Sequence, residues 1–233
     1  MFAVRIYGYG GQGSITIAET LAVAAFSEGK YALAFPGLRT ERAATPMVTC
    51  CRIDEIPVSR HAPVLHPDAV IVQDSTLLRQ VDVLDGIRPD GHVLVNSAHD
   101  AGELGLDDLA ARHGLPAARI LAVPATEITR RALGHPLPNA ALLGAFAAQT
   151  QVVTLLAVET AIREGFAGRV ATDNIEAARA AHAFVRYVLR DGAPRVASRG
   201  SHLAEKERSA GVDDPRRRYV DSARPLSEPR QRR

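Results

Sequence analysis

The stretch VRIYGYGGQGSITIAE, residues 4–19, joins a short apolar run to a helical pattern through a glycine loop at residues 8–13. Glycines let the backbone approach an anion closely. A helix that begins near Ser14 would turn free N–H groups and the positive end of its dipole toward that anion. The stretch therefore predicts a phosphate-binding loop at the first strand–helix junction, and a tight turn without a ligand is the alternative.

Beyond this loop, short β-rich runs alternate with helical patterns, which is typical of parallel βα units. The runs at 69–73 and 93–95 are apolar on both faces, as in central strands that are covered by helices on each side. We therefore predict an α/β fold, a doubly wound, mostly parallel sheet with helices on both faces, followed by C-terminal helices. The predicted strands are 4–7, 31–34, 47–53, 69–73, 92–96 and 119–123, and the predicted helices are 14–28, 106–113, 126–133, 140–150, 155–165 and 174–190.

Helix ends are marked by residues with capping chemistry. Gly29 and Gly134 are predicted to follow the ends of two helices, because glycine readily adopts the left-handed conformation found there. Thr172 and Asp173 are predicted to cap the last helix with their side-chain oxygens.

The C-terminal segment differs in composition from the rest of the 233-residue chain. Residues 195–233 hold 11 of the 28 Lys and Arg and 6 of the 26 Asp and Glu, which leaves 17 minus 20, a charge of −3, for the remainder. A basic segment with few large apolar residues cannot bury enough surface to offset its ordering entropy. We predict an α/β domain over 1–193 and a basic, disordered tail over 194–233, either a solvated extension or a tether to an acidic partner.

Composition disfavours several classes of function. Aromatic residues make up 5% of the chain and Trp is absent, so nucleic-acid binding is not expected. The adjacent Cys50 and Cys51 would point to opposite faces of a strand, so they form neither a mutual disulfide nor a shared ligand set for zinc or an iron–sulfur cluster. The histidines lack metal-ligand spacing, and no catalytic residue is predicted. Without a secretory signal or an apolar run of about 18 residues, we expect a cytoplasmic protein that does not contact membranes.

The glycine loop also has the G-x-G-x-x-G spacing of NAD and FAD sites. Those sites usually carry an acid at the end of the second strand, about 20 residues on, for the ribose hydroxyls. Residues 30–35, KYALAF, offer no acid, so a dehydrogenase with its own nicotinamide is disfavoured. A P-loop is disfavoured as well, because no Gly-Lys-Ser/Thr follows. The loop is thus expected to bind some other phosphate.

The glycine loop and the SITIAE that follows it are one of several blocks that closely resemble the gamma subunits of the pyruvate and related 2-oxoacid:ferredoxin oxidoreductases. The order and spacing of the blocks agree with that family, and the resemblance spans about residues 5–190. The other blocks are residues 28–36, 41–42, 46–48, 70–78 and 139–146.

This resemblance implies an enzyme subunit that is not catalytic alone. The family oxidatively decarboxylates a 2-oxoacid to an acyl-coenzyme A and CO2, and electrons pass to ferredoxin. Thiamine diphosphate, Mg and 4Fe–4S clusters belong mainly to partner subunits, here of alpha, beta and delta type. The gamma subunit resembles the coenzyme A-binding domain that packs against the thiamine-binding subunits. A stand-alone nucleotide- or coenzyme A-binding regulatory module is the alternative.

Carried over to this chain, the resemblance implies a coenzyme A site. Residues 10–13 would approach the phosphates or the adenosine ribose. Arg42 would pair with a phosphate in a bidentate way, or else form a surface salt bridge with Glu41. Asn139 either caps the following helix or contacts the cofactor. The predicted cofactor-binding residues are Gly8, Gly10, Gly11, Gln12, Gly13, Arg42 and Asn139.

The sequence departs from the family pattern in two places. The family usually has Arg at the position of Tyr9, and a basic residue and Gly at the positions of Ala43 and Ala44. The lost positive charge predicts weakened coenzyme A binding, or a substrate that does not need coenzyme A, as in oxalate-oxidising relatives.

Overall fold

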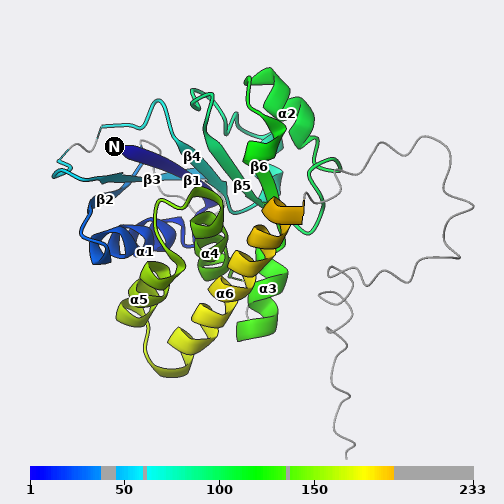
Figure 1. Cartoon of the computed structure of the whole chain (residues 1–233). Coiled ribbons are helices and arrows are strands. Elements are labelled where there is room, and N and C mark those ends of the chain that lie inside the picture. Colours follow the sequence, from blue (N-terminus) through cyan, green and yellow to red (C-terminus); the bar gives the residue numbers. More distant parts are fainter. Residues whose placement is uncertain (38–45, 60–61, 135–136, 192–233) are drawn as a thin grey trace, which may run out of the picture. The chain divides into compact units, whose positions relative to one another are not determined.

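The computed structural model of the chain describes residues 1–37, 46–59, 62–134 and 137–191. Figure 1 shows the arrangement of the helices and strands. Arg42, Ala43 and Ala44 lie outside the described residues, and so does the predicted tail with its boundary at residue 193.

Six strands form one sheet in the order β2-β3-β1-β4-β5-β6. The β1–β4, β4–β5 and β5–β6 pairs are parallel, whereas β3 is antiparallel to both β1 and β2. Five of the six strands therefore run in the same direction, and the predicted doubly wound, mostly parallel α/β fold is confirmed. The strands are β1 (Phe2–Tyr9), β2 (Tyr31–Pro36), β3 (Pro46–Asp54), β4 (Ala69–Val72), β5 (His92–Asn96) and β6 (Ile120–Val123).

The antiparallel strand β3 follows from the length of the connection before it. Only residues 37–45 separate β2 from β3, whereas a parallel crossover needs about a dozen residues or more. The two strands therefore pair side by side, with Phe35 opposite Cys50. Because β3 lies between β2 and β1, the end of β2 is one strand away from the glycine loop, unlike the second strand of a dinucleotide-binding fold.

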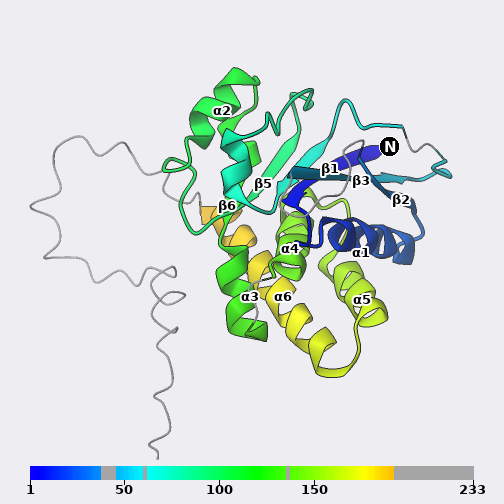
Figure 2. The ribbon, with the colours of Figure 1, turned by 180° about the vertical axis from the view of Figure 1, so that it is seen from behind.

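Helices cover both faces of the sheet, as Figures 1 and 2 show from opposite sides. Helices α1, α3, α4, α5 and α6 form a layer on one face, and α2 lies on the other. The helical elements are α1 (Ser14–Ser27), η1 (Ser75–Arg79), α2 (Leu106–Arg112), η2 (Ala117–Arg119), α3 (Ala125–Leu133), α4 (Asn139–Thr150), α5 (Leu155–Gly165) and α6 (Gly168–Asp191).

The hydrophobic core lies in two layers because successive side chains of a strand point to opposite faces. On the α2 face, alternate residues of β4 and β5, such as Val72 and Val95, pack with Leu77 of η1 and Leu106 of α2. On the other face, α4 is buried on all sides, with residues 140–149 all buried. This burial explains why α4 is apolar around its whole circumference.

Two helix ends are confirmed and one helix start is corrected. Gly29 and Gly134, with φ of 80° and 72°, follow the ends of α1 and α3 as predicted. Thr172 and Asp173 do not cap α6, because the helix begins at Gly168. Their side chains find partners one turn back instead, since the Thr172 hydroxyl donates to the Gly168 carbonyl and Asp173 pairs with Arg169.

Both cysteines lie on β3, and each is a buried free thiol. Burial raises the pKa of Cys51 to about 12 and also raises that of Cys50. The thiolate, which is the reactive form, is therefore disfavoured at both positions.

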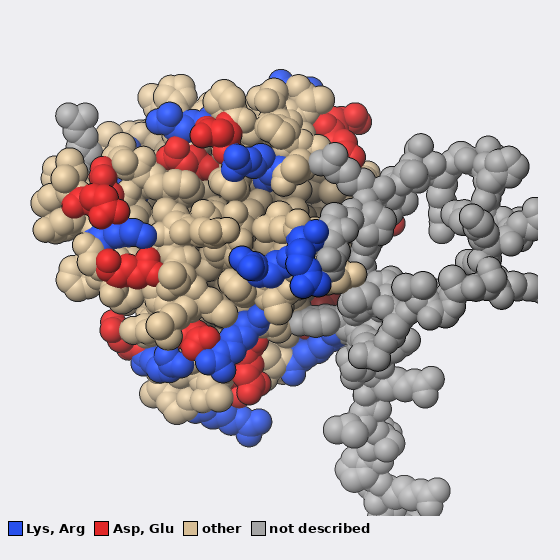
Figure 3. Space-filling model, in the orientation of Figure 1, with Lys and Arg blue, Asp and Glu red and all other residues tan. Residues whose placement is uncertain are grey.

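The surface carries a mixture of charges. Figure 3 shows acidic and basic side chains interspersed over the face in view. Among the described residues, no helix is long and apolar enough to cross a membrane.

Candidate functional site

The glycine loop lies where the connections of the sheet change face. Helix α1 follows β1 on one face, whereas η1 and α2 follow β4 and β5 on the other. The carboxyl ends of β1 and β4 are neighbours at this point. Open α/β sheets bind their ligands in the crevice at such a switch point.

The loop itself is a tight turn that leads into α1. The Gln12 N–H donates to the Tyr9 carbonyl at 3.1 Å. Gly11 has a φ of 87°, which the third residue of a type II turn requires, and Gly13, with a φ of 79°, is the N-cap of α1. Within the described part of the chain, no side chain caps α1, and its first turn contains no acid. The N–H groups of that turn have no intrahelical partners, so they are suited to bind an anion.

Amide side chains hold this loop in place. Gln12 Oε1 accepts from the Tyr9 N–H at 2.8 Å, and Gln12 Nε2 donates to Asp74 Oδ2 at 3.3 Å. Gln73 Nε2 donates to the Gln12 carbonyl at 3.0 Å and to Asn139 Oδ1 at 2.9 Å. The loop after β1 is therefore bonded to the end of β4 and to the start of α4.

Two of the predicted glycines make room for these amides. Gly8 lies in β1 itself, and a Cβ there would collide with Gln73 Oε1. A Cβ at Gly13 would lie 2.5 Å from Asn139 Nδ2. Side-chain packing thus explains glycine at position 8, and at position 13 packing and the φ of 79° both favour it. Contact of these two residues with a cofactor stays a prediction.

Asn139 does not cap α4, so the capping interpretation is wrong. It is the first residue of that helix, its predecessor Pro138 occupies the N-cap position, and no side chain caps the helix within the described residues. Besides bonding to Gln73, its Nδ2 lies 3.5 Å from the Gly13 carbonyl oxygen. The Asn139 side chain therefore contacts the glycine loop directly at Gly13 and indirectly through Gln73.

Tyr9 extends toward η1. Its hydroxyl lies 2.9 Å from Thr76 Oγ1 and accepts from Gln80 Nε2 at 2.6 Å. Its ring packs against the hydrophobic cluster on the α2 face. Both the ring and the hydroxyl are thus engaged within the subunit, and this position supplies no cation to the loop.

A second polar cluster at the end of β5 was not predicted. Asn96 Nδ2 donates to the Gln73 carbonyl at 2.9 Å and to Thr126 Oγ1 at 2.8 Å, while Asn96 Oδ1 accepts from the Thr126 N–H at 3.1 Å. The signal in the sequence is a polar residue at the end of a buried apolar strand. Gln73 follows AVIV, and Asn96 ends HVLVN.

These two clusters border a cavity of about 300 Å³. It opens between the carboxyl ends of β4 and β5, the start of α3 and the glycine loop. Its lining residues are Gln12, Gln73, Asp74, Ser75, Asn96, Ser97, Ala98, His99, Thr126, Glu127, Leu137 and Pro138.

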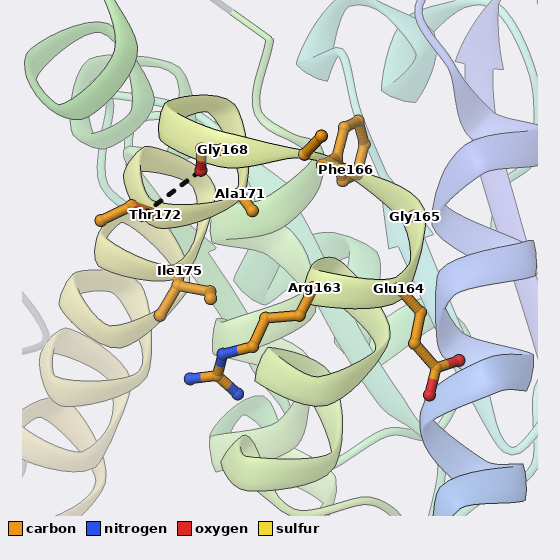
Figure 4. Close-up of a pocket in the computed structure, with 9 residues that line it drawn as sticks. Arg163, Glu164, Gly165, Phe166, Gly168, Ala171, Thr172 and Ile175 are labelled. Atoms are coloured by element: carbon orange, nitrogen blue, oxygen red, sulfur yellow. Dashed lines mark hydrogen bonds between the residues drawn. The ribbon is translucent and has the colours of Figure 1, made fainter.

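A larger hollow of about 540 Å³ lies between the end of α5 and the start of α6, at the end of the helical layer away from the sheet. Figure 4 shows Arg163, Phe166 and Ile175 around it. Two of its polar side chains already have partners, since Arg163 pairs with Glu159 and Thr172 bonds to the Gly168 carbonyl. The smaller cavity, with its convergent polar groups, is the better candidate for a binding site.

The described residues contain no group of three or more His, Cys, Asp or Glu side chains placed to hold a metal ion. The polar groups of the site are amides, hydroxyls, two carboxylates and the imidazole of His99, and they offer hydrogen bonds. The arrangement can therefore bind and orient a ligand.

Sequence comparison identifies related proteins. The profile of the family described as "Pyruvate ferredoxin/flavodoxin oxidoreductase" matches residues 3–184. The chain is 41% identical over 181 residues to the common gamma subunit of the pyruvate/ketoisovalerate oxidoreductases of Pyrococcus abyssi, an alignment that covers 78% of this chain and 95% of the relative. It is 37% identical over 182 residues to pyruvate synthase subunit PorC of Methanocaldococcus jannaschii, with coverage of 78% and 96%.

Solved structures agree with this comparison. Pyruvate oxidoreductase subunit PORC of Thermotoga maritima superposes with a TM-score of 0.65 at 32% identity, covering 78% of this chain and 95% of that one. A 2-oxoglutarate:ferredoxin oxidoreductase of Magnetococcus marinus, solved with 2-oxoglutarate, coenzyme A and succinyl-CoA bound, has a TM-score of 0.59 at 16% identity. That match covers 79% of this chain and 31% of the other, and at such identity it shows the fold alone.

Proposed function

The chain belongs to the pyruvate ferredoxin/flavodoxin oxidoreductase family as a gamma-type subunit, not catalytic alone, and on that premise we propose that it helps to bind coenzyme A. The complete enzyme would convert a 2-oxoacid to an acyl-coenzyme A and CO2 and reduce ferredoxin. Thiamine diphosphate, Mg and 4Fe–4S clusters would be held by partner subunits of alpha, beta and delta type. A cytoplasmic location is part of the same proposal.

The observation that carries the proposal is the glycine loop at the switch point of the sheet. The start of α1 presents N–H groups without an acid in the first turn, and Gly11 keeps the loop surface free of side chains. Such a helix start favours a bound phosphate through its dipole and its unpaired donors. Coenzyme A has phosphates, and a 2-oxoglutarate:ferredoxin oxidoreductase that has this fold in 31% of its chain was solved with coenzyme A bound.

The residues around the loop would fix its shape for this ligand. Gln73, which is 2% exposed, bonds to both the loop and Asn139. These bonds fix the loop, so the N–H groups at the start of α1 are oriented before a ligand arrives. Preorganised donors lose little conformational entropy on binding. Tyr9, whose hydroxyl is bonded within the subunit, would supply no charge, which favours weakened rather than tight binding.

The assembled complex tests the proposal. Purified with its partner subunits from the native host, it is expected to bind coenzyme A with a dissociation constant on the order of micromolar. Arg42→Ala should abolish that binding if Arg42 pairs with a phosphate, whereas Arg169→Ala, with a side chain that is 92% exposed, should leave it unchanged. Titration calorimetry measures both effects, and a complex that turns over a 2-oxoacid without binding coenzyme A would refute the proposal.

A further inference from the structure

We propose that the outer edge of β2 pairs with the β2 strand of a second copy of this chain, so that the two sheets join into one. β2 is the first strand in the order of the sheet, and among the described strands only β3 pairs with it (Figure 1). An edge strand presents a row of N–H and C=O groups to which an extended backbone can bond. This surface is separate from the glycine loop, and the inference does not depend on coenzyme A binding.

The hydrogen-bond pattern identifies the groups that β2 presents at this edge. The Gly37 N–H donates to the Val48 carbonyl at 2.7 Å, so these two residues form a hydrogen-bonded pair at the end of the β2–β3 ladder. Because such pairs alternate along an antiparallel ladder, the odd-numbered residues of β2 turn their N–H and C=O groups toward β3. Ala32 and Ala34 therefore turn theirs outward, and within the described residues these outward groups bond to nothing.

β2 lacks most of the features that keep edge strands from pairing. Its six residues, YALAFP, carry no charge, and their register with β3 has no bulge. Lys30, just before the strand, donates to the Val152 carbonyl at 2.6 Å and to Glu28 Oε2 at 3.1 Å, so its charge is held at the connection between α4 and α5. The opposite edge strand, β6, is protected better, since it has four residues and α6 contacts it.

A second copy fits this edge because β2 is complementary to itself. In an antiparallel arrangement that places Leu33 opposite Leu33 of the other copy, Ala32 of each strand faces Ala34 of the other. Each facing pair exchanges two N–H···O bonds, so four bonds form and the outward groups of both alanines are all used. The arrangement has a twofold axis and closes with two copies.

The neighbours of the two alanines fix this register. If one strand slid by two residues, Ala32 would face Pro36, which has no N–H, or Ala34 would face Lys30, whose N–H already bonds to the Ala25 carbonyl at 3.1 Å. Either shift would leave an outward carbonyl without a donor. The register centred on Leu33 leaves none.

The side chains beside the edge are apolar and exposed. Tyr31, at the start of β2, is 45% exposed, and Phe26, near the end of α1, is 71% exposed. The Gly29 N–H bonds to the Phe26 carbonyl at 2.9 Å, and this turn brings Phe26 to the start of β2. Two uncharged strands meet without repulsion between like charges. Because the paired region is small, the dimer should be reversible, with a dissociation constant on the order of tens of micromolar.

A cysteine at the centre of the pairing tests the partner and the register together. Leu33→Cys would face its counterpart at a non-hydrogen-bonded position, where Cα atoms lie about 4.5 Å apart and a disulfide can form. Leu121→Cys, at a partly buried position of β6, is the matched control. The full-length variants are oxidised over a series of protein concentrations, and the products are identified on non-reducing gels and by mass spectrometry. The native cysteines, Cys50 and Cys51, are buried thiols and should not cross-link.

A charge pair at the same position tests association at equilibrium. Leu33→Lys and Leu33→Glu each set like charges opposite each other, so each should raise the dimer dissociation constant about fivefold or more in sedimentation velocity. A mixture of the two variants sets opposite charges there and should restore association, which would also show that both variants are folded. Leu121→Lys should leave the dissociation constant unchanged.

The expected results are a disulfide that joins two copies through position 33 and restored association in the mixture. If Leu33→Cys cross-links no more than Leu121→Cys and the unmodified chain stays monomeric, the edge does not pair with itself and the inference fails. The assembled complex supplies a further test. If Leu33→Cys cross-links there to a different polypeptide, the edge is an interface with a partner subunit, which also overturns the pairing of two copies.

Discussion

Glycine serves the glycine loop and the α4–α6 interface for different physical reasons. In the loop, Gly11 has a φ of 87° and open space around its Cα, so the backbone conformation is what requires glycine. In α4, Gly144 has ordinary helical geometry, but a Cβ there would lie 2.6 Å from the carbonyl carbon of Ala178 and 2.7 Å from its Cα. At Gly144 the neighbouring helix requires glycine.

This difference predicts that substitutions at the α4–α6 interface affect mainly stability, whereas substitutions around the glycine loop also affect ligand binding. The α4–α6 contact is a backbone-to-backbone packing of two long helices, so a change there should affect folding. The loop is held by hydrogen bonds from Gln73 and Asn139 at the surface of the sheet, so a change there should affect ligand binding as much as folding. Three substitutions test this separation, from the largest expected effect to the smallest.

The largest effect is expected for Gly144→Ala. In an unhindered helix this substitution would stabilise the protein by about 0.5–1 kcal/mol, because alanine has the higher helix propensity. Here the new methyl group overlaps the backbone of Ala178, so we expect a loss of about 2–3 kcal/mol in the free energy of unfolding. Urea denaturation of the full chain measures it.

The control is Gly165→Ala at the end of α5, where a Cβ meets nothing within 4 Å. It should leave the stability unchanged or slightly higher. Equal effects at the two positions would contradict the packing explanation for Gly144.

A smaller loss of stability, with a clear loss of binding, is expected for Gln73→Glu. The carboxylate keeps the shape of the side chain but cannot donate to the Gln12 carbonyl or to Asn139 Oδ1. Two hydrogen bonds become contacts between acceptors in a buried place, which costs about 1–3 kcal/mol. The assembled complex should also bind coenzyme A more weakly.

Gln151→Glu, at the exposed C-cap of α4, is the matched control for charge. It should leave coenzyme A binding unchanged and cost at most about 0.3–1 kcal/mol, because its carboxylate faces the negative end of that helix. A Gln73→Glu variant with full stability but lost binding would show that Gln73 serves ligand binding rather than folding. One with lost stability and intact binding would show that Gln73 serves only the fold.

The smallest effect concerns the ion pair between α5 and α6. Hydrogen bonds from Arg179 hold the pKa of Glu159 below its usual 4.5, although burial of the carboxyl opposes this. The folded pKa is thus lower than the unfolded one, so the contribution is present above about pH 4.5 and is lost as the pH falls through the folded pKa. Glu159→Gln should cost about 1 kcal/mol at pH 7, and the difference should vanish in acid.

Thermal unfolding of the unmodified chain and of Glu159→Gln, recorded between pH 7 and pH 3, measures this difference in stability. Glu164→Gln changes an exposed carboxylate five residues after Glu159 on the same helix, and it should show no pH-dependent difference from the unmodified chain. Persistence of the Glu159→Gln effect at low pH would mean that packing rather than charge is responsible.

Much of the fold could be predicted from local patterns. Alternating β-rich and helical segments predicted all six strands, because a buried strand and an amphipathic helix each leave a periodic signal. The position of β3 could not be predicted in the same way, because pairing order depends on which strands meet in space. Likewise α6 starts six residues earlier than predicted, since Thr172 and Asp173 have capping chemistry but bond within the helix.

By itself, the sequence determined the class of fold, the glycine loop and the family, because these depend on local propensity and on residues that are contiguous in the chain. Only the tertiary structure decided what surrounds the loop. Gln73, Asn96 and Asn139 come from separate segments, and the sheet brings them together at the ends of its parallel strands. Their roles follow from long-range pairing and packing, which local sequence cannot express.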